Sequence, residues 1–304
     1  MSRGLYQMSL ISAYRFSAAA PGPALLLFGG IHGNEICGIE ALHRLKSELE
    51  SGALQLSCGS VTLVPVCNPE AHRQDRRFVE ENLNRIFTRH DNPANYEQRL
   101  ANELTVLVET HDALLDLHDV PQGDHAFTFI DYETPQNIAL AQAMGLSFWI
   151  TGWPEVFKTC PSPVGYGAIT GQDTQACAQT AGKPSILIEC GLRKSVASIE
   201  VAYQSARRFL SFYGMLPFDA PVTMQATHVY RIEQLVWKES EGNFAKPWQH
   251  LDDVSQGEVI ARYADGRELT SPFDGKIIIP SPNNPVGHEW YYLGRADAKY
   301  REEA

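Results

Sequence analysis

Residues 24–35 read ALLLFGGIHGNE, an apolar run that ends in the pair Gly29-Gly30 and is followed by polar residues. An uninterrupted apolar run closed by glycine predicts a strand that is buried on both faces of a sheet. The next segment, 35–49, repeats apolar residues with the period of a helix that packs through one face. A buried strand, a glycine turn and an amphipathic helix form the first unit of an alternating α/β fold. The apolar positions of this helix are Ile36, Ile39, Leu42, Leu45 and Leu49.

The same alternation continues along the first two thirds of the chain. Strands that alternate with helices pair mainly in parallel, so the pattern predicts an α/β domain with a mixed, largely parallel sheet flanked by helices. Helical periodicity predicts helices at 96–110 and 196–213, and apolar runs predict strands at 61–66, 113–118, 127–130 and 185–189.

The character of the chain changes after the segment MLPFDAP at 215–221, whose two prolines end the helical pattern. The remaining residues are rich in β-branched and aromatic side chains and in turn signals such as Asp265-Gly266 and Asp274-Gly275. This composition is typical of a small antiparallel β domain. We therefore expect an α/β domain over 1–217 and a C-terminal β domain over 218–304.

The composition limits the classes of protein that the chain can represent. Its 304 residues are 44% hydrophobic and 20% charged, which supports a large core and excludes a disordered or collagen-like chain. The net charge of −11 argues against a general electrostatic surface for nucleic acid. The N-terminus lacks a signal-peptide pattern, and every apolar run is shorter than the ~20 residues of a membrane span. Six cysteines without a CxxC pair fit reduced thiols, so we expect a soluble cytoplasmic protein without a membrane partner.

The turn after the first strand carries the first candidate site. His32 and Glu35 are three residues apart, where a predicted strand ends and a helix begins. Open α/β sheets bind ligands at the carboxyl ends of their strands, and a turn there can aim both side chains at one point. Imidazole and carboxylate are both zinc ligands, so this pair is a candidate for part of a zinc site.

The strand predicted at 113–118 leads into a second candidate, DLHD at 116–119. His118 could supply a third zinc ligand. Asp116 lies two residues earlier, so on a strand it shares a face with His118 and could orient that imidazole through a hydrogen bond. The alternative interpretation is a histidine that only completes the end of a strand.

Glu189 closes the apolar run at 185–188 and is the third candidate. Burial of a carboxylate costs free energy unless the group is paired or functional. Desolvation would also raise its pKa toward the range of a general base. The alternative is a carboxylate at the edge of the sheet that forms an ion pair.

The segment 68–89 concentrates arginine in an otherwise acidic chain. The planar guanidinium fork suits carboxylates and polarised carbonyls, so the segment is a candidate for binding an acidic substrate. Glu80 and Glu81 could instead pair with some of these cations on a mixed-charge surface helix. The five arginines are Arg73, Arg76, Arg77, Arg85 and Arg89, and Asn82 and Asn84 lie among them.

Taken together and in this order, four motifs resemble those of the succinylglutamate desuccinylase/aspartoacylase family, which is related to the zinc carboxypeptidases. They are GGIHGNE at 29–35, NPEAHRQDRRFVEENLNRIF at 68–87, DLHD at 116–119 and LIECG at 187–191. The resemblance covers residues 24–215 and continues more loosely to the C-terminus. It implies a zinc-carboxypeptidase-like sheet followed by a small C-terminal β domain.

The resemblance implies a role for each matching residue. His32, Glu35 and His118 would bind one Zn²⁺ and leave a fourth position for water. Glu189 would take a proton from that water and pass it to the leaving amine. Arg77 would help to stabilise the oxyanion of the tetrahedral intermediate.

Further residues would bind the substrate. Asn84 and Arg85 would hold a substrate carboxylate, Arg85 by a bidentate contact. The C-terminal domain could contribute Tyr291 or Tyr292 to the mouth of the site, although two aromatic residues in a β core are the alternative.

The chain departs from the family pattern at two places. Where aspartoacylases carry a tyrosine and an arginine for the substrate, this sequence has Gln175 and Gln179. Asp119 follows His118, where a carboxylate could repel an acidic acyl group. We therefore expect a substrate less acidic than N-acetylaspartate or a succinyl amino acid.

The leading interpretation is a zinc-dependent amidohydrolase that acts on a small N-acyl amino acid bearing a carboxylate. A metallocarboxypeptidase that cleaves a short peptide or modified amino acid would use the same residues. A non-catalytic small-molecule-binding protein with this fold is the alternative of another class, and it predicts loss of a metal ligand or of the base. The motifs leave open whether the protein forms a homo-oligomer.

Overall fold

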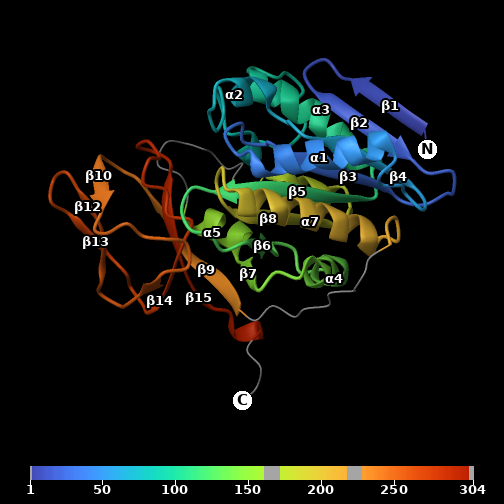
Figure 1. The fold of residues 1–304 in the computed structure, drawn as a ribbon. Coiled ribbons are helices and arrows are strands. Elements are labelled where there is room, and N and C mark those ends of the chain that lie inside the picture. Colours follow the sequence, from blue (N-terminus) through green and yellow to red (C-terminus); the bar gives the residue numbers. More distant parts are fainter. Residues whose placement is uncertain (1, 161–171, 218–227, 301–304) are drawn as a thin grey trace.

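The computed structural model describes residues 2–160, 172–217 and 228–300 (Figure 1). A twelve-stranded sheet runs through the described part of the chain. Its strands lie in the spatial order β1 (Ser2–Gln7), β2 (Ser12–Ser17), β4 (Ser60–Val64), β3 (Ala24–Gly29), β5 (Ala113–Val120), β8 (Ser185–Leu192), β6 (Phe127–Phe129), β7 (Phe148–Thr151), β9 (His228–Trp237), β15 (Glu289–Ala296), β14 (Gly275–Ile278) and β11 (Asp253–Val254).

The four central strands β4, β3, β5 and β8 are parallel, as the alternating sequence pattern predicts. Strand β3 is buried on both faces because its successive side chains enter different cores. Leu25 and Leu27 belong to one hydrophobic cluster, while Leu26 and Phe28 belong to another. The uninterrupted apolar run after residue 23 thus reflects a strand covered on both sides.

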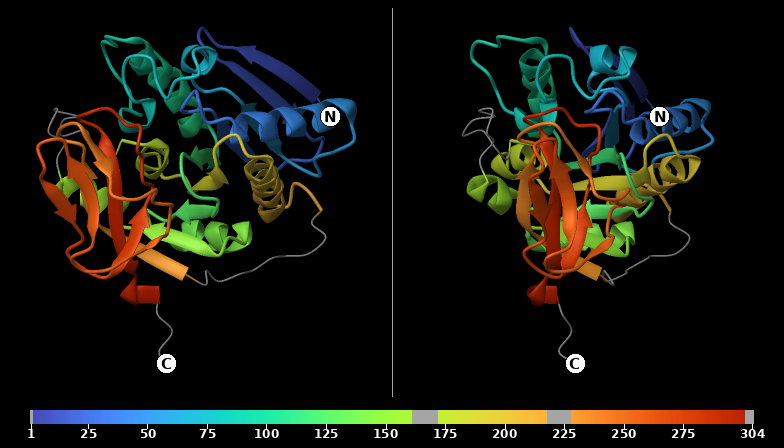
Figure 2. Two further views of the ribbon diagram at one scale, coloured as in Figure 1. Left: turned by 60° about the vertical axis from the view of Figure 1, so that its left-hand side comes forward. Right: turned by 90° about the vertical axis from the view of Figure 1, so that its left-hand side faces the viewer.

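Helices cover both faces of these strands (Figures 1 and 2). One cluster packs α1 (Cys37–Ser51), α4 (Pro135–Met144) and α7 (Val196–Phe212) against the sheet. The other packs α3 (Tyr96–Thr110) and α6 (Thr174–Thr180) against the opposite face. None of the described helices has the length and apolar character needed to cross a bilayer. Shorter helical segments are α2 (Pro69–Arg73), η1 (Leu83–Arg85), α5 (Trp153–Thr159) and η2 (Ala298–Tyr300).

The C-terminal region is built from β-strands, as predicted. Strands β9, β15, β14 and β11 pair antiparallel and extend the main sheet, because β9 lies parallel to β7. A second sheet, formed by β10 (Gly242–Phe244), β12 (Val259–Tyr263) and β13 (Glu268–Thr270), lies at the far end of this region (Figure 1). The predicted boundary between 217 and 218 falls at the edge of 218–227, which lies outside the described residues.

The predicted fold class is therefore confirmed, and the differences lie in element ends and in short elements. Helix α1 begins at Cys37 rather than at residue 35, because the Glu35 N–H donates to His32 O in a tight turn. Helix α4 was not predicted, although its N-terminus carries a capping signal. Thr134 caps this helix by accepting a hydrogen bond from Asn137 N, and Pro135 occupies its first turn. Other elements of the α/β part that were not predicted are β1, β2, α2, η1, β7, α5 and α6.

Gly33 fixes the path of the turn between β3 and α1. A Cβ atom at this position would lie 2.2 Å from the Ala71 carbonyl carbon and from His72 N, both of which are backbone atoms. The Gly33 N–H donates to Arg77 O at 3.2 Å. The turn and the arginine-rich segment therefore approach each other closely only because Gly33 has no side chain.

We expect Gly33→Ala to destabilise the protein by about 1–3 kcal/mol or more, because a buried backbone cannot yield to the added methyl group. It should also reduce Zn²⁺ retention after dialysis, since His32 and Glu35 flank the displaced residue. Gly182→Ala is the matched control. Gly182 has φ +68° and nothing near its Cβ position, so this change should cost roughly 1–2 kcal/mol of strain and leave metal content unaltered. Equal metal content in both variants would contradict the proposed role of Gly33.

Candidate active site

The predicted site residues meet at the carboxyl ends of the central parallel strands. His32 and Glu35 follow β3, His118 lies in β5, and Glu189 lies in β8 directly opposite His118 in the strand register. All four line a cavity of about 350 Å³. Parallel strands present their carboxyl ends at one edge of a sheet, which explains how residues far apart in sequence converge.

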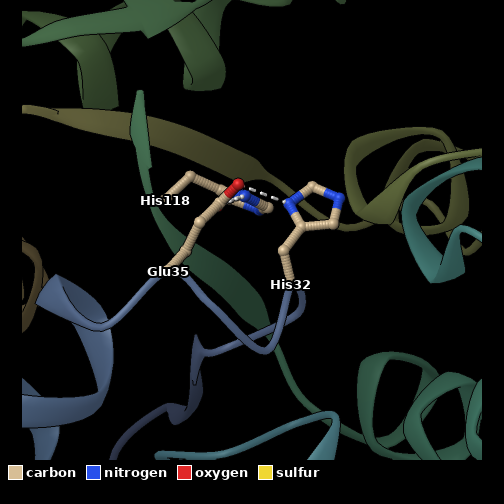
Figure 3. A group of neighbouring side chains, drawn as sticks. All are labelled: His32, Glu35 and His118. Atoms are coloured by element: carbon tan, nitrogen blue, oxygen red, sulfur yellow. Dashed lines mark hydrogen bonds and ion pairs between the residues drawn. The ribbon is translucent and has the colours of Figure 1, made fainter. Parts of the chain in front are cut away.

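His32, Glu35 and His118 form a buried cluster (Figure 3). Glu35 Oε1 lies 2.9 Å from His32 Nδ1, and Glu35 Oε2 lies 2.9 Å from His118 Nδ1. One ligand atom from each residue can be chosen so that all lie within 4.8 Å of one another. Two imidazoles and a carboxylate at this spacing can hold a divalent metal ion, and an open fourth position is typical of catalytic zinc sites.

The outer nitrogen of each imidazole has its own partner. His118 Nε2 lies 2.9 Å from Asp116 Oδ2, which also accepts a hydrogen bond from Thr174 Oγ1 at 2.6 Å. His32 Nε2 lies 3.1 Å from Asn82 Oδ1. A proton on each Nε2 leaves each Nδ1 lone pair directed toward the cluster, which is the arrangement that metal-binding histidines require. The sequence predicted that Asp116 would orient His118. It placed Asn82 in the arginine-rich segment but did not predict its contact with His32.

The donor set fits a cation at its centre. Asn82 Oδ1 also accepts from Asn84 N at 3.0 Å, so it acts as an acceptor and His32 Nε2 must donate to it. Burial lowers the pKa of His32 to about 3, and among the described residues its Nδ1 finds no hydrogen-bond partner despite its contact with Glu35. The Nδ1 lone pair of His32 therefore faces the Glu35 carboxylate without a proton between them. A divalent cation at the centre would accept both this lone pair and the carboxylate as ligands, so the donor set fits a metal ion.

Two arginines offset the charge of Glu35. Arg77 donates to Glu35 Oε1 at 2.6 Å, and Arg193 donates to the same oxygen at 3.3 Å. Burial favours the protonated acid, but His32 and Arg77 hold the pKa of Glu35 well below its usual value. Arg193 was not predicted as a site residue, because it lies just after β8, outside the recognised motifs.

Asp119 has a different environment from the one expected of it. Its carboxylate accepts from Arg193 Nε at 2.9 Å and from Cys37 N at 3.3 Å. Burial, and next the charge of Glu35, raise its pKa to about 6. Its charge is thus partly neutralised inside the protein, which weakens the expected repulsion of an acidic acyl group.

Glu189 lies in the cavity beside the cluster without a partner for one oxygen. Its Oε2 is buried and forms no hydrogen bond within the described part of the protein. Burial raises the pKa of Glu189 to about 8, while His118 opposes this shift. A carboxylate with such a pKa can exchange a proton near neutral pH, which suits a general base.

The predicted carboxylate-binding residues Asn84 and Arg85 also line the cavity. Arg85 Nε donates to Glu289 Oε1 at 2.9 Å, and its guanidinium carbon lies 5.1 Å from the ring centroid of Trp153. Glu289 comes from the C-terminal region, so sequence spacing could not have revealed this ion pair. The contact joins the two halves of the chain at the site.

Of the two tyrosines expected near the mouth of the site, Tyr291 does not line the cavity. Tyr291 is buried among aromatic residues of the C-terminal region, while its neighbour Tyr292 lines the cavity. Successive side chains of β15 point to opposite faces, so only one of the two can reach the site. Gln175 is buried in α6, Gln179 is exposed, and neither lines the cavity.

The fold and these side chains define a mixed α/β protein with a candidate metal centre and an adjacent carboxylate. The sequence profile for the succinylglutamate desuccinylase/aspartoacylase catalytic domain matches residues 21–206, more than half of the chain. The chain belongs to the succinylglutamate desuccinylase/aspartoacylase family, whose members are deacylases that hydrolyse amide bonds.

Curated relatives agree with this assignment. A succinylglutamate desuccinylase from Pseudomonas paraeruginosa is 40% identical over 119 residues, which cover 36% of this chain and only 35% of that protein. Another from Pseudomonas fluorescens is 25% identical over 276 residues, covering 86% of this chain and 80% of that protein.

Solved structures share the fold. A succinylglutamate desuccinylase/aspartoacylase from Rhodobacter sphaeroides has a TM-score of 0.75 at 20% identity and covers 96% of this chain and 90% of its own. The product-bound ectoine utilization protein EutE from Ruegeria pomeroyi has a TM-score of 0.74 at 20% identity. The match covers 94% of this chain and 89% of that protein.

We expect His118→Ala to lose Zn²⁺, measured as metal content after loading and dialysis, because two ligands hold the ion far less tightly than three. Asp116→Asn should retain the ligands but weaken affinity by about 10–100-fold, since the imidazole loses its orienting carboxylate. His90→Ala is the control, because His90 contacts Ile86 O outside the cluster. Full metal content in His118→Ala would exclude it as a ligand.

The raised pKa of Glu189 predicts a pH-dependent stability of the metal-free protein. The folded state holds a proton on Glu189 up to about pH 8, whereas the unfolded state releases it near the ordinary value of 4.5. This group therefore lowers the free energy of unfolding as pH rises between those values. Glu189→Gln should remove that contribution, so its gain in melting temperature over the native protein should be larger at pH 9 than at pH 5. The exposed Glu239→Gln should show no such trend.

Proposed function

We propose that this protein is a zinc-dependent amidohydrolase that removes the acyl group from a small N-acyl amino acid. The observation that carries the proposal is Glu189, a buried carboxylate with an unpartnered oxygen beside the His32, Glu35 and His118 cluster. Zn²⁺ held by these three residues would lower the pKa of a water molecule and polarise the acyl carbonyl.

Glu189 is proposed to move the proton. Its Oε2 accepts a proton from the attacking water and later delivers it to the nitrogen of the leaving amine. A carboxylate that is paired with a cation would be a weaker base. Because Glu189 forms no ion pair in the described structure, its basicity is retained.

Arg77 is proposed to stabilise the oxyanion. Its guanidinium lies at the cavity wall and contacts Glu35 through one nitrogen, Nη1. A fixed cation at this place offsets negative charge that develops on the acyl oxygen, with little reorganisation during the reaction. Asn84 and Arg85 are proposed to hold the substrate carboxylate deeper in the cavity.

The form of the cavity supports a small substrate over a peptide. Its volume of about 350 Å³ suits a small molecule. Residues of the C-terminal region, including Pro282, Asn284 and Tyr292, close one side of it. We accordingly assign residues 1–217 to a catalytic domain and 218–304 to a β domain that bounds the site. Separately, because all six cysteines are free thiols, we place the enzyme in the cytoplasm.

We expect Glu189→Gln to retain Zn²⁺ and to lower kcat by about 10²–10⁴-fold, the usual contribution of a general base. The side chain keeps its size, so folding should be preserved. Glu155→Gln, an exposed position outside the cavity, provides the control for loss of one negative charge. Activity of Glu189→Gln within a factor of a few of the native enzyme would remove Glu189 from the mechanism.

A substrate panel distinguishes this proposal from its alternatives. The zinc-loaded protein should hydrolyse neutral N-acyl amino acids more efficiently than either dipeptides or N-acetylaspartate, as judged by kcat/KM. Faster cleavage of dipeptides would favour a metallocarboxypeptidase. Equal or better activity on N-acetylaspartate would refute the expectation of a less acidic substrate, and binding without turnover would favour a non-catalytic protein.

A further inference from the structure

The cavity contains two carboxylates that the proposed reaction does not use. Asp131 follows β6, and Asp173 caps the N-terminus of α6 by accepting a hydrogen bond from Ala176 N. Both line the cavity together with Arg85. Neither was among the predicted site residues, because each follows a segment without a recognised motif.

These two carboxylates lack a counter-ion of their own. Within the described ranges, neither forms an ion pair, whereas Glu289, which lines the same cavity, is paired with Arg85. Asp131 Oδ1 is buried and accepts no hydrogen bond from any residue that the structure describes. Burial and then the charge of Asp173 raise the pKa of Asp131 well above its usual value. A buried carboxylate without a partner is costly, and a cation that enters the cavity would remove that cost.

The balance of charge near Arg85 is negative. Arg85, together with Arg77, which also acts on Glu289, supplies two positive charges, and Glu289, Asp131 and Asp173 supply up to three negative charges around this part of the cavity. The undescribed residues 161–171 contain no Asp, Glu, Lys, Arg or His, so they add no charge to this balance. A second acidic group on the substrate would therefore meet repulsion at this end.

The chemistry of the lining favours an organic cation over a second metal ion. In the described residues, His32, Glu35 and His118 are the only cluster of three or more candidate ligands with converging atoms. Phe129, Trp153 and Tyr292 line the cavity as well. Aromatic rings beside carboxylates can enclose an aliphatic chain and stabilise the cationic group at its end.

We propose that Asp131 and Asp173 form a subsite for a positively charged group, so that the substrate is an N-acyl amino acid whose side chain ends in an ammonium or guanidinium. Asn84 and Arg85 would bind its carboxylate, and the acyl amide would face Glu189. This inference rests on the proposed deacylase function and specifies its substrate class.

The test compares three substrates on the zinc-loaded enzyme that share one acyl group and differ in side-chain charge. They are the Nα-acyl derivatives of lysine, norleucine and glutamate, where norleucine supplies a neutral chain close in length to that of lysine. The expected order of kcat/KM is lysine, then norleucine, then glutamate. Calorimetry of the free products should likewise show tighter binding of lysine than of norleucine, which gives a readout independent of turnover.

Two variants test whether the preference for a cationic side chain depends on Asp131 and Asp173. Asp131→Asn and Asp173→Asn should each lower the ratio of kcat/KM for the lysine to the norleucine derivative by about 10–100-fold, mainly through KM, as expected for loss of a charged hydrogen bond. Asparagine keeps the size of both side chains and also caps helices well, so Asp173→Asn preserves α6. Glu155→Gln removes a nearby but exposed charge and should change the ratio less than threefold.

The outcomes separate this inference from the proposed function. Turnover of the norleucine derivative without preference for lysine, or an unchanged ratio in both aspartate variants, would overturn the cationic subsite and leave the deacylase proposal standing. Absence of turnover for every derivative, with zinc fully bound, would overturn the deacylase proposal itself. The tighter binding of lysine, lost in Asp131→Asn, would then still support the subsite.

Discussion

The carboxylate of Glu35 contacts four side chains from separate parts of the chain, and the geometry of the site depends on it. His32 lies in the same turn, Arg77 in the arginine-rich segment, His118 in β5 and Arg193 after β8. A single buried charge that is balanced by several partners holds these segments in fixed relation, because each partner offsets part of the cost of burying that charge. The candidate metal site is therefore also a structural junction of the fold.

The fold supplies what this junction needs. Parallel strands bring His118 and Glu189 next to each other, and Gly33 allows the turn after β3 to approach the backbone of α2. Helices on both faces remove water from the sheet, which strengthens the electrostatic interactions at its edge. The same exclusion of water raises the pKa of Glu189. Burial of the sheet by helices therefore strengthens the contacts within the cluster and also shifts the pKa of the carboxylate beside it.

The two halves of the chain divide the cavity between them. The α/β part provides the cluster and Glu189, while the C-terminal β region provides Tyr292 and, through Glu289, a partner for Arg85. Because β9 continues the main sheet beside β7, this region is held at a defined place against the site. Substrate preference is thus shared between the halves, and the proposed cationic subsite lies where Asp131 and Asp173 meet this boundary.

The sequence by itself determined the alternation of strands and helices and the positions of His32, Glu35, His118 and Glu189, because buried strands and their polar ends leave a local pattern. It also indicated Asp116 through strand periodicity. Only the tertiary structure decided which of Tyr291 and Tyr292 faces the cavity, that Arg193 neutralises Asp119, and that Asp131 and Asp173 share a cavity with Arg85. Those outcomes depend on contacts between segments far apart in the chain, which no local period or spacing encodes.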